Sequence, residues 1–221
     1  MNNIYCISGL GADHRLFANL HIEGHTLLPL PWVPFEGSDD MSSYAKKMFY
    51  SIPEDDPIVM GLSLGGMLTT EMCKAHKVKH GILISSAKTK QELGYNIPVA
   101  LAAGAMKLLP GSTFVTPFPF ALSMLGVHTD EEKKLLRNII ADADPTFVQW
   151  CIKALLAWRN REIPANISHI HGTADKVISP SNVKPDHWIQ NGSHFMIYDR
   201  AAEVSAWINE QLGIPDLKIG S

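Results

Sequence analysis

Short, unbroken apolar runs alternate along this chain with segments of helical periodicity. Four such runs occupy residues 3–7, 26–30, 57–60 and 81–85, and the first three lead into loops that contain glycine or proline. Strands that are buried on both faces of a sheet have this unbroken pattern, and their alternation with helices favours parallel strands joined by right-handed crossovers. We therefore expect an α/β fold, with a mostly parallel sheet and helices on both of its faces.

One long interval interrupts this alternation. Between residues 88 and 161 the apolar segments have a helical period, and no strand-like run with turn signals occurs. The strand pattern returns at residues 167–171 and 186–190, and an amphipathic helix follows near the end of the chain. A length of 221 residues suits about one domain. The sequence therefore predicts a single domain over residues 1–221, in which residues 88–161 are inserted as a helical cap.

Charge and composition argue against several classes of partner. The net charge is −3, with acidic and basic residues interspersed, so no broad positive field is available to attract nucleic acid. No stretch approaches roughly 18 uncharged apolar residues, and no basic segment leads into an apolar run at the start, so we expect no membrane span and a cytoplasmic protein. Cys6, Cys73 and Cys151 lie too far apart to form a metal-binding or disulfide pattern. We expect neither a metal nor another cofactor.

The segment from Gly61 to Gly65 has the Gly-x-Ser-x-Gly pattern of a nucleophile elbow. It lies between an apolar run and an amphipathic helix, which is the context that this motif requires. Small residues on either side of Ser63 let the strand and the helix approach each other, and the turn exposes the hydroxyl at the start of the helix. The pattern makes Ser63 a candidate nucleophile. The alternative is a tight glycine turn whose serine only caps the helix.

A serine hydroxyl needs a base to remove its proton at neutral pH, and histidine is the side chain whose ordinary pKa is suited to that task. Among ten histidines, His194 follows the last apolar run in a polar glycine loop, from which it can reach over the carboxyl edge of the sheet. The imidazole in turn needs a carboxylate to hold its tautomer. Asp175 follows the strand that ends at His171, and a glycine turn carries it to the same edge. The three residues form a predicted Ser–His–Asp triad.

Acyl transfer also requires hydrogen-bond donors for the oxyanion. For a nucleophile elbow, one donor is the backbone N–H of the residue after the nucleophile, and a second comes from an early strand-to-helix loop. These would be the N–H of Leu64 and the N–H of either Leu10 or Gly11, in the glycine loop after the first apolar run.

At these residues the chain resembles the α/β-hydrolase superfamily, in particular its small esterase-like members. The segments typical of that family are residues 61–66, 171–175 and 192–195. The resemblance covers nearly all of the chain except the helical interval, which it implies is a cap over the active site. It also implies the roles of nucleophile, acid and base for Ser63, Asp175 and His194.

Two features depart from the family pattern. Many members begin the oxyanion loop with His-Gly, whereas this chain has Ser8 and Gly9, which leaves the choice between Leu10 and Gly11 open. The chain also starts directly at the strand that bears this loop, so the first two strands of the family, a hairpin at one edge, are expected to be missing. The sheet would then contain about six strands, all of them parallel.

The expected reaction is hydrolysis of a small carboxylic ester, or of a thioester, through an acyl-enzyme on Ser63. The predicted cap region carries apolar candidates for a substrate pocket, namely Phe118, Met124, Trp150 and Trp158. Because one fold can support several functions, a C–C bond hydrolase, a cofactor-free lyase and a non-catalytic ligand-binding or signalling protein remain alternatives.

Overall fold

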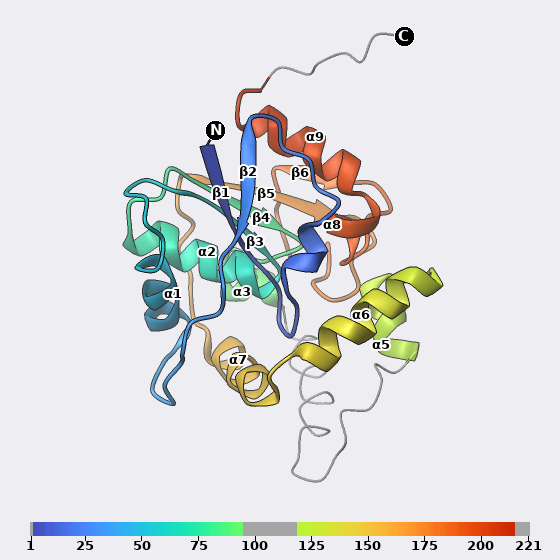
Figure 1. Cartoon of the computed structure of the whole chain (residues 1–221), viewed down its shortest axis with the longest axis horizontal. Coiled ribbons are helices and arrows are strands. Elements are labelled where there is room, and N and C mark those ends of the chain that lie inside the picture. The colour runs from blue at the N-terminus through green and yellow to red at the C-terminus, as the bar shows by residue number, and fades with distance from the viewer. Residues whose placement is uncertain (1, 95–118, 215–221) are drawn as a thin grey trace.

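A computed structural model describes residues 2–94 and 119–214 of the chain, apart from the side chains of residues 119–121. Within these residues a six-stranded sheet forms the centre of the molecule, with all neighbouring strands parallel (Figure 1). The strand order is β2-β1-β3-β4-β5-β6. The bounds are β1 (Asn2–Ile7), β2 (His25–Pro29), β3 (Ile58–Leu62), β4 (His80–Ile84), β5 (Ile167–Gly172) and β6 (His187–Ile189). The expected parallel sheet of six strands is confirmed.

Both faces of this sheet are apolar, which explains the unbroken hydrophobic runs in the sequence. Successive side chains of a strand point to opposite faces. In β1, Ile4 and Cys6 belong to one buried cluster, whereas Tyr5 and Ile7 belong to the other. Burial on both faces requires helices on both sides, and the described segments supply them.

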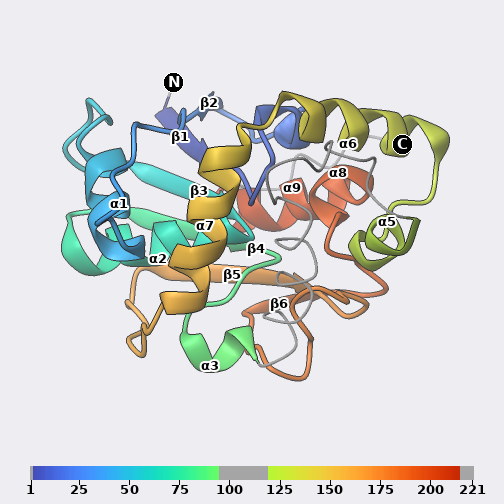
Figure 2. The same cartoon turned by 90° about the horizontal axis from the view of Figure 1, so that it is seen from below.

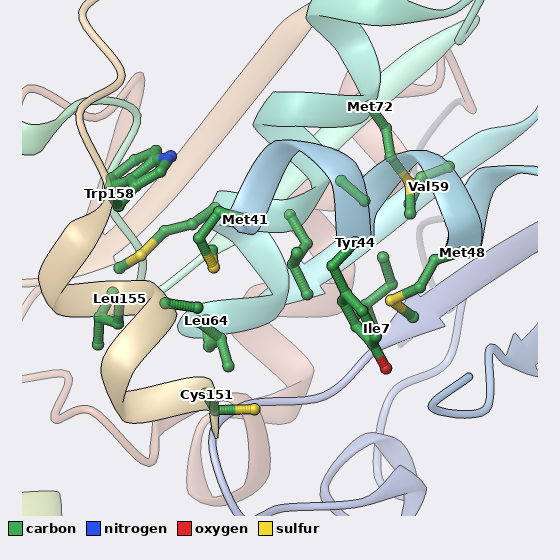
Figure 3. Packing of buried hydrophobic residues seen from close by; sticks show 14 of the residues in the cluster. Ile7, Met41, Tyr44, Met48, Val59, Leu64, Met72, Cys151, Leu155 and Trp158 are labelled. Carbon is green, nitrogen blue, oxygen red and sulfur yellow. The ribbon is translucent and has the colours of Figure 1, made fainter. Parts of the chain in front are cut away.

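Helices cover the two faces in separate groups. On one face the core contains residues of α1 (Met41–Phe49), α2 (Leu64–Ala75) and α7 (Pro145–Ala157), and Figure 3 shows part of this packing. The other face is covered by η1 (His14–Phe17), α5 (Pro119–Leu125), α6 (Asp130–Asp142), α8 (Met196–Asp199) and α9 (Ala201–Gln211). Two of these helices begin at a capping box, formed by Asp40 with Ser43 before α1 and by Thr129 with Glu132 before α6. The caps satisfy backbone N–H groups that the first helical turn leaves free.

Between β4 and β5 the described residues form α3 (Lys90–Leu93), α5, α6 and α7. The last three lie at the end of the molecule toward which β1 runs, as Figures 1 and 2 show. Within the described ranges this interval contains helices and no strand, as the helical periodicity predicts. None of the helices in the described ranges is long and apolar enough to cross a membrane.

Candidate active site

Ser63 stands in the sharp turn between β3 and α2. Its backbone has φ 53° and ψ −114°, a conformation that L-amino acids seldom adopt. The end of β4 holds this turn on both sides of the serine. The Ser63 N–H donates to the carbonyl of Ile84 at 3.0 Å, and the hydroxyl of Ser86 donates to the carbonyl of Ser63 at 2.6 Å. These hydrogen bonds therefore hold the serine in its strained backbone conformation.

The glycines around Ser63 are required by close backbone contacts. A Cβ atom on Gly61 would lie 2.3 Å from the carbonyl atoms of Gly65, and one on Gly65 would lie 2.2 Å from the carbonyl oxygen of Ile7. A Cβ atom on Gly66 would lie 2.4 Å from the hydroxyl of Ser86. These distances are far below ordinary contact distances, so the strand and the helix can meet only if these positions lack side chains. The sequence analysis expects this requirement for small residues.

The three predicted triad side chains lie in hydrogen-bond contact. Asp175 follows β5, and His194 lies in the loop between β6 and α8. The Nδ1 atom of His194 is 2.8 Å from Oδ2 of Asp175, and its Nε2 atom is 3.1 Å from Oγ of Ser63. A carboxylate only accepts hydrogen bonds, so Nδ1 carries the proton, and Nε2 of the neutral ring is free to accept from the serine hydroxyl. The fold thus joins a hydroxyl, an imidazole and a carboxylate from three loops at one edge of the sheet.

Asp175 is buried, with 3% of its surface exposed, and is surrounded by donors. Its Oδ1 atom accepts the N–H groups of Val177 and Ile178 at 2.8 and 2.9 Å. Burial by itself raises the pKa of this carboxyl, but the neighbouring His194 and the hydrogen bonds outweigh burial, so the pKa of Asp175 is lowered. The carboxylate is therefore ionised at neutral pH and fixed in orientation.

The glycine loop after β1 lies directly beside Ser63. A Cβ atom on Gly9 would be 3.4 Å from the Cβ of Ser63. The N–H of Ala12 donates to the carbonyl of Gly9 at 3.1 Å, and Gly11 has φ 64°, as the third residue of a type II turn requires. Leu10 and Gly11, the predicted donors, form the middle of this turn. Leu64 is the first residue of α2, where backbone N–H groups have no partner within the helix.

A cavity of about 560 Å³ adjoins this loop. Its walls come from the loop after β1, the loop after β2 and the junction between α6 and α7. Most of the lining is apolar or aromatic, and three aspartates stand among it. The lining residues are Gly11, Ala12, Asp13, Trp32, Val33, Pro34, Phe35, Ile139, Asp142, Ala143, Asp144, Phe147 and Val148. The triad side chains are not part of this lining, and of the predicted oxyanion donors it includes only Gly11.

The predicted pocket residues lie elsewhere. The indole N–H of Trp150 donates to the carbonyl of Asp39 at 3.2 Å, and that of Trp158 donates to Oε1 of Glu71 at 2.8 Å. Both indoles are buried and pack α7 against α1 and α2, as Figure 3 shows for Trp158, so neither lines the cavity. Met124 is half-buried on α5 and is also not part of the lining, and Phe118 lies outside the described residues.

The aromatic wall of the cavity was not predicted from the sequence. Trp32 and Phe35 come from the loop after β2, and Phe147 comes from the first turn of α7. The ring of Phe147 lies 4.9 Å from that of Trp32 and 5.7 Å from that of Phe35. The available signal was the position of Trp32 and Phe35 after a parallel strand, where loops reach the carboxyl edge of the sheet.

Other reactive groups offer no competing site in the described residues. Burial raises the pKa of Cys73 and Cys151 to about 12, so both remain protonated thiols at neutral pH. Burial also raises the pKa of Cys6. Among residues 2–94 and 119–214, no group of three histidine, cysteine, aspartate or glutamate side chains is arranged to hold a metal ion. The hydroxyl of Ser63 is therefore the strongest candidate nucleophile in this part of the chain.

Comparison with known proteins gives a fold and no sequence family. No family model and no curated protein sequence matches the chain. Solved structures do match over almost its entire length. An enol-lactonase from Burkholderia xenovorans has a TM-score of 0.73 at 15% identity, and the match covers 96% of this chain and 91% of the enol-lactonase.

Two further structures give similar values. A thermophilic esterase from Thermogutta terrifontis has a TM-score of 0.72 at 14% identity, with 96% of this chain and 90% of the esterase covered. An N-acyl homoserine lactonase has a TM-score of 0.71 at 18% identity, with coverage of 100% and 92%. At such low identity the likeness concerns the backbone architecture, which these proteins share with the chain.

Proposed function

Starting from the α/β-hydrolase fold of this chain, we propose that it is a serine hydrolase that cleaves a small carboxylic ester through an acyl-enzyme on Ser63. The observation that carries this proposal is the hydrogen-bonded series from Ser63 through His194 to Asp175, with distances of 3.1 and 2.8 Å. A base in contact with the nucleophile, and a buried acid in contact with the base, are what nucleophilic catalysis by serine requires. The similar structures named as esterase and lactonases support the ester as substrate, since a lactone is a cyclic ester.

In the proposed mechanism, Nε2 of His194 takes the proton of Ser63 as Oγ adds to the carbonyl carbon of the ester. The N–H of Leu64 and that of Leu10 or Gly11 then donate to the oxygen of the tetrahedral intermediate. The bond to the alcohol oxygen breaks, and the alcohol leaves with the proton from His194. Water attacks the acyl-enzyme with the same base, which releases the acid and restores Ser63. The ionised Asp175 stabilises the charged imidazole in both halves of the cycle.

The cavity beside the oxyanion loop supports an apolar substituent on the substrate. Its volume of about 560 Å³ is within the range of small-molecule sites, and its aromatic wall suits an acyl chain or a small ring. We include in the proposal that residues 88–161 form a cap, because α6 and α7 supply one side of this cavity. A thioester would use the same groups. Turnover rates of oxygen esters and thioesters that carry the same acyl group distinguish the two.

The decisive experiment is covalent labelling of the whole protein with a fluorophosphonate, with Ser63→Ala as the control. Labelling of the wild-type protein only, together with turnover of p-nitrophenyl esters of increasing acyl length, is the expected result. Labelling without ester turnover would favour a C–C bond hydrolase or a lyase on the same scaffold. A folded wild-type protein that does not label would refute an activated serine and favour a ligand-binding protein.

A further inference from the structure

A second imidazole contacts the buried carboxylate of the proposed triad. His171 stands near the end of β5 and has no exposed surface. Its Nε2 atom lies 3.0 Å from the carbonyl oxygen of Ile178 and 3.4 Å from Oδ2 of Asp175. A carbonyl can only accept, so the proton of His171 must be on Nε2, from where it is donated to Ile178. The Oδ2 atom of Asp175 therefore accepts from His194, while the ring of His171, which bonds to Ile178, lies in contact with the same oxygen atom.

The other nitrogen of His171 is also accounted for. Its Nδ1 atom lies 3.3 Å from Nε2 of His169, which is buried on the same face of β5. Burial lowers the pKa of both rings, so both are neutral at pH 7. With its proton on Nε2, the neutral His171 has a bare Nδ1 that accepts from His169. The neighbouring histidine thus selects the same tautomer of His171 as the carbonyl of Ile178 does.

We propose that His171 is a positioning residue for Asp175. Its Nε2–H donates to the carbonyl of Ile178 and so holds the turn whose Ile178 N–H donates to Oδ1 of the carboxylate, which leaves Oδ2 oriented to accept from His194. This inference rests on the proposed function of Ser63, His194 and Asp175. His171 touches no reacting atom and acts only through the acid.

The surroundings explain why the orientation of the ring is well defined. The indole of Trp188 on β6 packs edge-to-face against it, with ring centres 5.9 Å apart. The Oδ1 atom of Asp175 is occupied by two backbone N–H groups, so the direction of Oδ2 is the remaining freedom of the carboxylate. The N–H of His194 at Oδ2 and the contact of the same oxygen with the buried ring of His171 restrict that freedom.

Few other titratable groups act on this pair. His194 faces Asp175 from the loop before α8, and His169 faces His171 from β5. Lys88, on the segment after β4, acts electrostatically on His169 and lies 3.6 Å from Glu92 of α3. A change in the titration of His194 on substitution of His171 therefore reports mainly on the carboxylate between them.

The test compares three variants of the full chain with the wild type. His171→Phe keeps a ring of similar size and removes the donor. His171→Gln places an amide N–H at the same distance along the side chain as Nε2. His80→Phe is the matched control, because it removes from β4 a half-buried ring whose Nε2 bonds to Ser168 Oγ at 2.8 Å, away from the triad. Each protein is examined by NMR titration of the His194 ring and by kinetics with a p-nitrophenyl ester.

We expect the imidazolium of His194 to be stabilised less in His171→Phe, because the carboxylate is no longer oriented toward Nδ1. The acidic limb of kcat/KM then moves to lower pH. We also expect kcat to fall between about tenfold and a hundredfold, with KM unchanged, because the acid is no longer held in place. His171→Gln should largely keep the wild-type acidic limb and the wild-type kcat, and His80→Phe should leave both unchanged.

An unchanged His194 titration and unchanged kcat in folded His171→Phe would overturn the proposal, as would equal changes in His80→Phe. If the phenylalanine variant does not fold, His171→Asn replaces it, since its shorter amide cannot reach the carbonyl of Ile178. Equal behaviour of the asparagine and glutamine variants then argues against a donor role. The NMR titration needs no substrate, so a protein without ester turnover whose His194 still responds to His171 would refute only the proposed function.

Discussion

The backbone at Ser63 leads to a stability prediction that has the opposite sign from the usual effect of glycine. With φ 53° and ψ −114°, a residue with a Cβ atom is strained there by about 1–3 kcal/mol. Glycine has no Cβ atom and is not strained in this conformation, although its greater conformational freedom in the unfolded chain lowers the stability of the folded protein by about 0.5–1 kcal/mol. Both Ser63→Gly and Ser63→Ala lose the hydroxyl and its contact with His194. We therefore expect the glycine variant to be more stable than the alanine variant by about 1 kcal/mol.

Chemical unfolding in urea measures this difference, provided that the slope of the transition is the same for both variants. In a thermal scan the same difference corresponds to about 2–4 °C for a chain of this length. The matched control is Ser205, which lies in the helix α9 and whose hydroxyl accepts the N–H of His21 at 2.9 Å. There Ser205→Gly should be less stable than Ser205→Ala by about 1 kcal/mol, because glycine weakens a helix.

Equal stability of the two Ser63 variants, or a more stable alanine variant, would refute strain at this position if the Ser205 pair has the expected order. Neither Ser63 variant should react with a fluorophosphonate. The comparison therefore measures the backbone strain at position 63 separately from the reactivity of the serine hydroxyl.

Three other changes have outcomes that follow directly from the coordinates. Asp175→Asn keeps the shape of the acid but presents an amide to His194, so the imidazole adopts the wrong tautomer and kcat for an ester should fall by about 10⁴-fold. Gly65→Ala places a Cβ atom 2.2 Å from a backbone carbonyl and should lower the free energy of unfolding by at least about 2 kcal/mol, whereas Gly37→Ala, with no atom within 4 Å, should not. Burial lowers the pKa of His169 and His171, so only the unfolded chain binds these protons as the pH falls below about 6.5. The free energy of unfolding should then fall by up to about 1.4 kcal/mol per pH unit for each ring, measured from urea midpoints at pH 7, 6 and 5.

For each of these predictions, one result would contradict the reasoning. Wild-type kcat in the folded asparagine variant would remove Asp175 from the mechanism. Similar free energies of unfolding for Gly65→Ala and Gly37→Ala would mean that the elbow tolerates a side chain. A free energy of unfolding that stays constant between pH 7 and 5 would mean that the two buried histidines take up protons in the folded protein.

The features that the sequence predicts correctly are those that depend on neighbours along the chain. The strand β3 is apolar at every position because it is buried on both faces, and the elbow after it is specified by glycines within five residues of one another. The capping box of Thr129 and Glu132 is equally local. In each case the physical requirement, whether burial, close approach or a free N–H group, is met by residues that are adjacent in sequence.

The features that the sequence misses depend on which segments meet in space. An apolar helix with tryptophans can face a pocket or the core, and the partners of the indole N–H groups decide between them. Trp150 and Trp158 find those partners in Asp39 and Glu71, more than 80 residues away along the chain. The contact of His171 with the acid depends in the same way on how the turn after β5 folds back, which no periodicity reveals.

Strand β4 contributes none of the triad side chains but does much to position them. β4 lies between β3, which leads to Ser63, and β5, which leads to Asp175. Its end accepts the N–H of Ser63 through Ile84, and the hydroxyl of Ser86 donates to the carbonyl of the same serine. Because catalytic geometry must be held within about 0.5 Å, these backbone contacts matter as much as the reacting groups. A loss of activity on substitution of Ser86 would therefore reflect movement of the nucleophile, and it should appear in the labelling rate even when His194 and Asp175 remain in contact.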